Sequence, residues 1–182
     1  NNGHISIDGV CEHGLYMSGG TFTNGTDATL NITNVGQTAA DKEHLYIDDS
    51  GGNGATFNNN GTVTIVMVSG DEGIYINDGS TFNNAGMVNI STGVGASSHI
   101  GLYIVDANSK FTNMVGGTLH ITDATNIGIQ IDNNSQTPAA RLDNAGIITI
   151  TNGNNDGMRL QEGAVLMNSG IMNISNPSEQ GM

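Results

Sequence analysis

The chain repeats one pattern six times, and this repeat constrains its fold more than any other feature. The pattern is clearest from Gly73 to Ile90, GIYINDGSTFNNAGMVNI. A glycine precedes two alternating apolar residues, a Phe or Leu is followed two places later by Asn, and a second glycine opens another alternating apolar pair. Such a unit cannot bury its apolar face alone, so copies of it are expected to stack. The repeats begin at Gly14, His44, Gly73, Gly101, Gly128 and Gly157, with a partial copy at Gly181, which gives units of 24 to 30 residues.

The alternation of apolar and polar residues within each unit indicates strands with one buried face. In the copy at Gly73 these strands centre on Ile74 to Ile76, on Phe82 and on Val88 to Ile90. We therefore predict an all-β fold, a right-handed parallel β-helix (β-solenoid) with three short strands per coil and about six and a half coils. Connections of variable length favour the right-handed coil, and no useful stretch has the helical period.

The pattern runs through residues 1–182 without a domain boundary, so we expect a single β-solenoid segment. Residues 3–7 match only the last strand of a unit, and residues 180–182 match only the start of the next one. We expect a segment truncated at both ends from a longer repetitive protein. The longest connections, residues 33–43 and 91–100, extend one edge, which is often where repeat proteins make contacts.

The composition limits the partners that the chain can bind. Four Lys plus Arg stand against 17 Asp plus Glu, a formal net charge of −13. Nucleic acids and anionic membrane surfaces need many cationic contacts, so both are disfavoured. No apolar run is long enough to span a bilayer, and the lone Cys11 permits no intrachain disulfide. An acidic chain rich in Asn, Thr and Gly favours a secreted or cell-surface setting.

Three sets of equivalent residues are expected to form structural ladders along the stack. The asparagine has the same parity as the buried Phe or Leu, so its amide is expected to point inward at a corner and bond the coils on either side. The glycine that follows is expected to have a positive φ at that corner. The ladder residues are Phe22, Phe57, Phe82 and Phe111; Asn24, Asn59, Asn84, Asn113, Asn144 and Asn168; and Gly61, Gly86, Gly116 or Gly117, Gly146 and Gly170.

Four tyrosines occupy one outward position of successive first strands: Tyr16, Tyr46, Tyr75 and Tyr103. Aromatic side chains stacked on a sheet surface protect it by cross-strand packing. The alternative is a contact surface for sugar rings or for a neighbouring rod.

Acidic residues follow the first strands, with two basic residues beside the second strands. Solvated turn residues are the expected role of the acids, because loops of unequal length spoil the fixed geometry of a calcium site. Calcium binding or catalysis on polysaccharide remain the alternatives, and we predict no required cofactor. The residues are Asp48, Asp49, Asp78, Asp106, Asp132 and Glu162, with Lys110 and Arg141.

The outward side of the third strands is rich in Thr and Asn. Met87, Ile147, Ile171 and His120 interrupt it, and together with residues 66–68 they indicate a patch for lateral packing. The five histidines show no metal-ligand spacing, and Cys11 with His13 lacks a third catalytic partner.

The segment GIYINDGSTFNNAGMVNIS, Gly73 to Ser91, resembles repeats of large bacterial surface proteins. These are autotransporter passengers and filamentous haemagglutinin-type adhesins, and the resemblance extends through essentially all 182 residues. It implies a β-helical shaft whose activity belongs to decorating loops or tip domains. His44 in place of the first glycine, and Leu142 and Leu166 in place of Phe, depart from the pattern.

The leading hypothesis is a non-enzymatic structural segment of a long extracellular fibre or adhesin shaft that bundles with copies of itself. The alternative is a module that binds glycans or cells through the tyrosines and the inserted loops. A polysaccharide-active enzyme is the third hypothesis.

Overall fold

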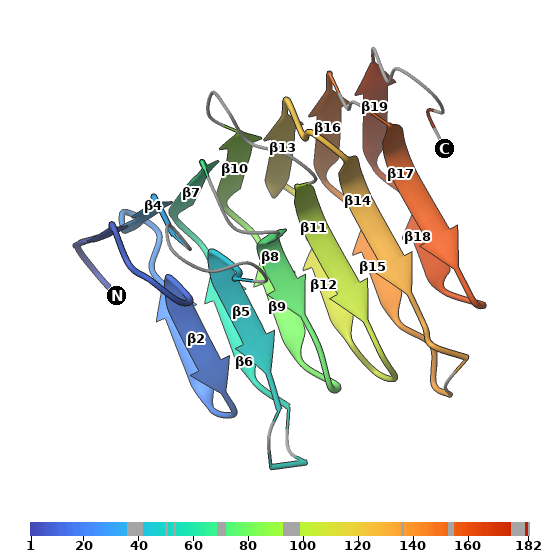
Figure 1. The fold of residues 1–182 in the computed structure, drawn as a ribbon, viewed down its shortest axis with the longest axis horizontal. Coiled ribbons are helices and arrows are strands. Elements are labelled where there is room, and N and C mark those ends of the chain that lie inside the picture. Colours follow the sequence, from blue (N-terminus) through green and yellow to red (C-terminus); the bar gives the residue numbers. More distant parts are fainter. Residues whose placement is uncertain are drawn as a thin grey trace.

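The computed structural model describes residues 1–35, 42–49, 51–52, 54–68, 72–92, 99–135, 137–152, 155–175 and 181. Nineteen strands in these ranges form three parallel sheets, and the described ranges contain no helix. After β1, every coil contributes one strand to each sheet in the same order. In Figure 1 the chain runs down the near side, passes behind and returns upward while it advances from the N to the C end, which makes the coil right-handed. The predicted β-solenoid is confirmed.

The three sheets are named by the order of their strands within a coil. The first sheet comprises β2 (Leu15–Ser18), β5 (Leu45–Asp48), β8 (Glu72–Ile76), β11 (Ile100–Val105), β14 (Ile127–Asp132) and β17 (Asp156–Gln161). The second sheet comprises β3 (Thr21–Asn24), β6 (Thr56–Asn59), β9 (Thr81–Asn84), β12 (Lys110–Asn113), β15 (Arg141–Asn144) and β18 (Val165–Asn168). The third sheet comprises β1 (His4–Asp8), β4 (Thr29–Thr33), β7 (Thr62–Met67), β10 (Met87–Thr92), β13 (Thr118–Thr122), β16 (Ile147–Thr151) and β19 (Ile171–Ser175).

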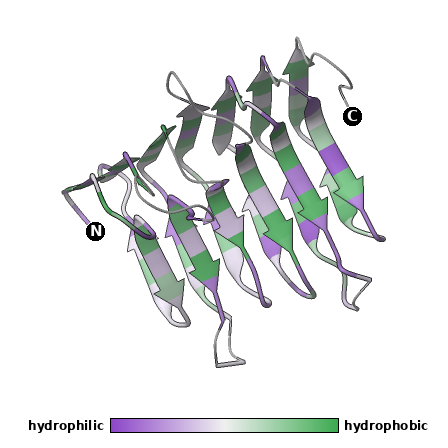
Figure 2. Cartoon of the chain, in the orientation of Figure 1, coloured by the Kyte–Doolittle hydropathy of each residue, from purple (hydrophilic) through white to green (hydrophobic). Residues whose placement is uncertain are grey.

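Equivalent residues of successive coils are paired in register, so like side chains lie above one another. Phe57 pairs with Phe82 on the second sheet, and Val63 pairs with Val88 on the third. The alternation of hydropathy along the strands is visible as green and purple bands in Figure 2. Two of the longest connections fall partly outside the described residues, at 36–41 and 93–98.

A column of phenylalanines runs through the core behind the second sheet. The ring centroids of Phe22, Phe57, Phe82 and Phe111 are separated by 5.0, 4.6 and 5.1 Å, and the planes are tilted by 18–26°. Leu142 continues the column in the next coil and is fully buried. Stacked aromatic pairs contribute about 0.5–1.5 kcal/mol each beyond the apolar area that they bury. The column therefore joins neighbouring coils as well as filling the interior.

The corner asparagines form an unbroken chain of side-chain hydrogen bonds along the axis. Each Nδ2 donates to the Oδ1 of the asparagine in the next coil and to the carbonyl oxygen of the residue that opens the next third strand. The Nδ2-to-Oδ1 distances between consecutive asparagines are 2.9, 2.9, 2.8, 2.8 and 2.7 Å, in the order Asn24, Asn59, Asn84, Asn113, Asn144 and Asn168. Because these amides are almost completely inaccessible to water as far as Asn144, losing one partner leaves buried polar atoms unsatisfied.

The expectation of positive φ at the corner glycines is wrong for Gly61, Gly86, Gly146 and Gly170, none of which has a positive φ. The reason for glycine is instead the close approach of the adjacent coil. A Cβ at Gly86 would lie 2.1 Å from the carbonyl oxygen of Gly61, and one at Gly170 would lie 2.2 Å from that of Gly146. Of the glycines predicted at this corner, Gly116, in the longer version of the corner, is the one with a positive φ, of 86°.

The expected lateral patch is wrong at Met67, which is fully buried. Strand β7 continues to that residue, so the alternation that buries Val63 and Ile65 also turns Met67 inward. Met87, Ile147 and Ile171 do lie on the outside, with exposed fractions of 43%, 40% and 54%.

Replacing Asn84 with Ala should lower the free energy of unfolding by about 3 kcal/mol. The substitution removes donations to Asn113 and to the Thr118 carbonyl, and it removes the acceptor for Asn59. The matched control is Asn83→Ala, one residue away, because that outward side chain donates to Asn58 alone. Chemical denaturation should show a loss below about 1 kcal/mol for the control. Equal losses for the two variants would contradict a special role of the buried amide chain.

Replacing Gly86 with Ala should destabilise the chain by more than about 3 kcal/mol, because the added methyl overlaps the backbone of the preceding coil. Gly3 has open space around it and no positive φ, so Gly3→Ala should stay within about 0.5 kcal/mol of the original chain. Thermal unfolding of the two variants checks this, and a stable Gly86→Ala protein would show that the coils are not so closely stacked.

Candidate functional site

The four tyrosines form one continuous column on the outer side of the first sheet. They come from β2, β5, β8 and β11, and their ring centroids lie 5.1, 5.1 and 5.2 Å apart in order. Successive planes are inclined by 39°, 73° and 75°. Two neighbouring rings that are nearly perpendicular cannot both present a flat face outward. The column therefore packs mainly against itself, and only Tyr16, with an exposed fraction of 47%, is largely open to solvent.

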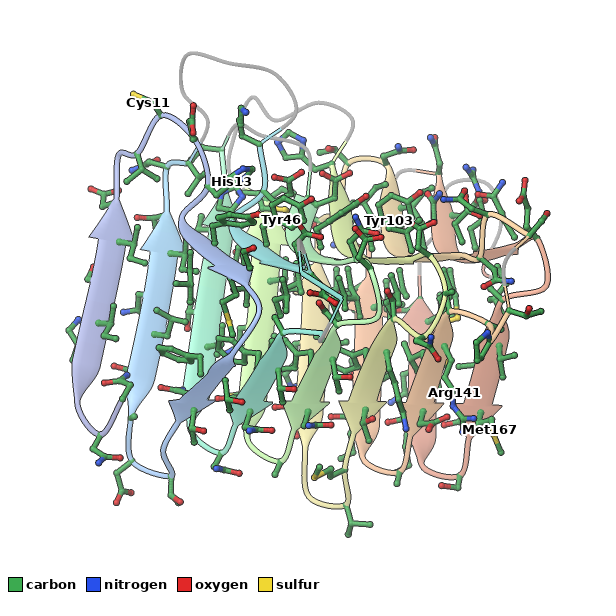
Figure 3. The ribbon with its side chains drawn as sticks, turned by 90° about the horizontal axis from the view of Figure 1, so that it is seen from below. Cys11, His13, Tyr46, Tyr103, Arg141 and Met167 are labelled. Atoms are coloured by element: carbon green, nitrogen blue, oxygen red, sulfur yellow. The ribbon has the colours of Figure 1, made fainter. Side chains whose placement is uncertain are left out.

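His13 extends the column at its N-terminal end, as Figure 3 shows beside Tyr46. Its ring centroid lies 5.4 Å from that of Tyr16 and 5.0 Å from that of Tyr46. His13 Nδ1 lies 2.6 Å from Glu43 Oε2, so the ring also belongs to an ion pair when it is protonated. Burial raises the pKa of Glu43, and attraction to His13 opposes part of that rise. Sequence reasoning missed this pair, because its members lie in connections that do not follow the repeat.

Burial shifts the titration of the inner tyrosines. It raises the pKa of Tyr46 to about 12 and that of Tyr103 to about 12, and it raises the pKa of Tyr75 further. Nearby carboxylates act in the same direction, because a tyrosinate would be repelled by them. The hydroxyls of these three inner tyrosines thus stay neutral near pH 7. At the end of the column, the Tyr16 hydroxyl donates a hydrogen bond to Asp48 Oδ2 at 3.2 Å.

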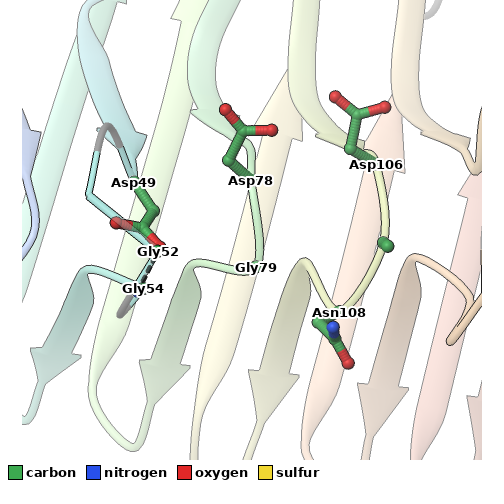
Figure 4. Close-up of a pocket in the computed structure, with 8 residues that line it drawn as sticks. Asp49, Gly52, Gly54, Asp78, Gly79, Asp106 and Asn108 are labelled. Carbon is green, nitrogen blue, oxygen red and sulfur yellow. Dashed lines mark hydrogen bonds between the residues drawn. The ribbon is translucent and has the colours of Figure 1, made fainter.

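Three of the acidic residues line one open hollow beside the turns that follow the first strands. Asp49, Asp78 and Asp106 come from successive coils, and the hollow has a volume of about 710 Å³ (Figure 4). The Asp49 carboxylate caps its own loop by accepting hydrogen bonds from the Gly51 and Gly54 amides at 2.9 and 2.6 Å. Burial, and then repulsion from Asp48 and Asp106, raise the pKa of Asp78. The hollow is therefore acidic.

The remaining acidic candidates lie elsewhere. Asp48 is largely buried beside Tyr16, and Asp132 accepts the backbone N–H of Asn134 at 3.1 Å within its turn. Within the described ranges, no group of three or more His, Cys, Asp or Glu has an arrangement that would hold a metal ion. The structure thus brings Asp49, Asp78 and Asp106 into one hollow and leaves Asp48 and Asp132 out of its lining.

The two basic candidates, Lys110 and Arg141, are paired with one acid on the second sheet. Asp143 Oδ2 lies 2.9 Å from Lys110 Nζ, and Asp143 Oδ1 lies 2.8 Å from Arg141 Nη2. Burial alone would raise the pKa of Asp143, but hydrogen bonds from Arg141 and Lys110 outweigh it and hold that pKa below its ordinary value. Arg141 also contacts Met167, as seen in Figure 3. The second sheet therefore carries two positive charges against one negative charge in this cluster.

The free cysteine and two of the other histidines differ in how far they are exposed to solvent. Cys11 is free and exposed at the tip of a connection (Figure 3). His44 is fully buried where most coils have glycine, and burial lowers its pKa to about 4, so it is neutral near pH 7. His99 is also buried.

No family model matches the chain, and no curated protein or solved structure matches it significantly. No helix in the described residues has the length and apolar character needed to cross a membrane. What the molecule shows is a β-solenoid of stacked parallel strands, with an aromatic column and an acidic hollow on its surface.

At about pH 11, Tyr46, Tyr75 and Tyr103 should remain protonated in the folded protein and should ionise together when it unfolds. Each pKa is higher in the folded state than the ordinary value of about 10, so the unfolded chain loses protons first. Stability should consequently fall as the pH rises through this window. Tyrosinate absorbance recorded alongside circular dichroism tests this, and ionisation of Tyr46, Tyr75 and Tyr103 near pH 10 with the fold intact would contradict it.

Proposed function

We propose that this chain is a shaft segment of a long extracellular or cell-surface fibre. Its role is to space and project, in the manner of the β-helical repeats of autotransporter passengers and haemagglutinin-type adhesins that its sequence resembles. The observation that carries the proposal is the amide chain from Asn24 to Asn168, which joins consecutive coils by hydrogen bonds of 2.7 to 2.9 Å. Such a chain resists both bending and separation of the coils.

The modular construction of the stack supports the same role. Every sheet is formed by in-register pairing of equivalent residues, so a coil can be added or removed without changing the contacts of its neighbours. Length is then proportional to the number of coils, which is the property that a spacer needs. The net charge of −13 opposes nonspecific collapse onto other acidic surfaces.

Glycan binding is the second candidate, supported by the exposed face of Tyr16 beside His13. The nearly perpendicular packing from Tyr46 to Tyr103 limits that surface to one end of the column. A glycan array distinguishes the two functions, because a binding module should give saturable signals that Tyr16→Ala abolishes.

Deleting residues 73–127 should test the shaft function directly. The deletion removes two complete coils and joins Glu72 to Gly128, which preserves the repeat because Glu72 and Ile127 both pair with Ile100. Small-angle scattering should show a folded rod shorter by about 10 Å, and duplicating the same residues should lengthen it by about 10 Å. On the producing cell, both variants of the native polypeptide should keep any adhesive activity that the polypeptide has. Complete loss of adhesion in the deletion variant, with the fold intact, would contradict a spacer and favour a binding module.

A further inference from the structure

The outer side of the third sheet is the longest regular surface of the molecule. Seven parallel strands lie side by side in it, and each presents alternate residues to solvent. From β4 to β19 the outward residues are all Thr, Asn, Ser, Val, Met, Ile or His. None of them is Lys, Arg, Asp or Glu. We call this surface, from Thr29 to Ser175, the neutral face.

The absence of charge on the neutral face contrasts with the rest of the chain. The formal net charge is −13, and acids occupy the turns after the first strands as well as the other sheets. The second sheet carries Lys110, Arg141 and Asp143 on its outer side. A chance distribution of 21 charged side chains would be expected to place some of them among the outward positions of six strands. The neutral face is therefore a distinct surface.

Exposed apolar side chains form a row on this surface. Met87, Thr118, Ile147 and Ile171 are register partners in successive strands, and the three apolar members have exposed fractions of 40% to 54%. Val115, in the turn before Thr118, is 83% exposed at the border of the face. Their burial against a partner would be favourable, at about 25 cal/mol per Å² of apolar surface removed from water.

Charge and periodicity identify a second copy of this chain as the partner. Two molecules of charge −13 repel each other through every surface that carries acids, so close approach is least opposed at the neutral face. A second copy also presents rows at the same coil spacing of about 4.8 Å, which lets side chains interdigitate along the whole face. An unrelated surface would match the rows at only a few positions.

The size of the neutral face predicts a weak association. Six strands at about 4.8 Å spacing and five residues of about 3.3 Å each give about 470 Å² per molecule. A stable interface usually buries about 800 Å² per partner, so a pair of these segments should be in rapid exchange. Additional coils would enlarge the face, and the affinity should rise with the length of the shaft.

We propose that the neutral face is a self-association surface through which two copies of this chain pack side by side, third sheet against third sheet. The proposal rests on the shaft function and adds to it the surface by which shafts form bundles. No ionic contact is involved, so screening the mutual repulsion should strengthen the association.

The test makes the same nearly isosteric change, Asn to Asp, on two different sheets. Asn89 lies in the middle of β10, the central strand of the third sheet, and Asn83 is an outward residue of β9 in the same coil. Asn89→Asp places a charge at the centre of the contact in both copies, whereas Asn83→Asp adds the same charge to the second sheet. Both variants are compared with the original chain by sedimentation equilibrium under reducing conditions, since Cys11 is exposed and free. Circular dichroism verifies that the fold is retained.

The original chain should form dimers whose dissociation constant decreases as the salt concentration rises. Asn89→Asp should raise that constant at least about tenfold at low salt, and Asn83→Asp should leave it within about twofold. A chain that stays monomeric, an unchanged constant for Asn89→Asp, equal effects of the two variants, or association weakened by salt would each overturn the proposal. The shaft function would survive those outcomes, because the deletion of residues 73–127 tests it separately.

Discussion

Each side chain in this fold must tolerate a copy of its own position one coil away, and the rest of the structure depends on that constraint. Phenylalanine satisfies it by stacking, with centroids as close as 4.6 Å. Asparagine satisfies it because an amide is both donor and acceptor, so an identical neighbour completes its hydrogen bonds. Glycine satisfies it by leaving room for a carbonyl of the adjacent coil. A like-charged pair could not do so in the interior, and the described core holds neutral residues at these positions.

The same constraint explains where variation is found. Residues in turns and at outward positions do not have to stack in the interior. At these places the connections differ in length and the residues differ in type from coil to coil. Acids gather in the turns after the first strands, where Asp49, Asp78 and Asp106 line an open hollow. From β4 to β19 the outer side of the third sheet carries uncharged residues in every coil, as the interior does, but it is not buried. The proposed shaft would use both kinds of surface, the charged one to stay soluble and the neutral one to pack against a second copy.

Much of the fold could be predicted because the sequence shows two periods. Apolar and polar residues alternate every two residues along each strand, and the whole pattern recurs once per coil. The inward residues of each strand, including Phe82 and Asn84, follow from parity alone. The reason for the corner glycines could not be read in this way, because a positive φ and the close approach of a carbonyl oxygen would both favour glycine in the sequence. At Gly86 only the second applies, since a Cβ there would meet the carbonyl oxygen of Gly61. The pairing of His13 with Glu43 and the perpendicular tyrosine rings depend on non-repeating connections and on side-chain rotation, which the pattern does not encode.

The central claim is that neighbouring coils are in register, and thiol cross-linking tests it most directly. In a Cys11→Ser background, Asn58→Cys and Asn83→Cys would place thiols on paired residues of adjacent coils, about 4.8 Å apart at Cα. That separation lies within the range of about 4.4–6.8 Å that a disulfide spans. Thr112→Cys pairs with position 83, one coil farther from position 58, and serves as the control. We predict rapid intramolecular cross-linking for positions 58 and 83 and none for positions 58 and 112. Equal cross-linking of the two pairs, or cross-linking of the distant pair alone, would contradict the stacked register.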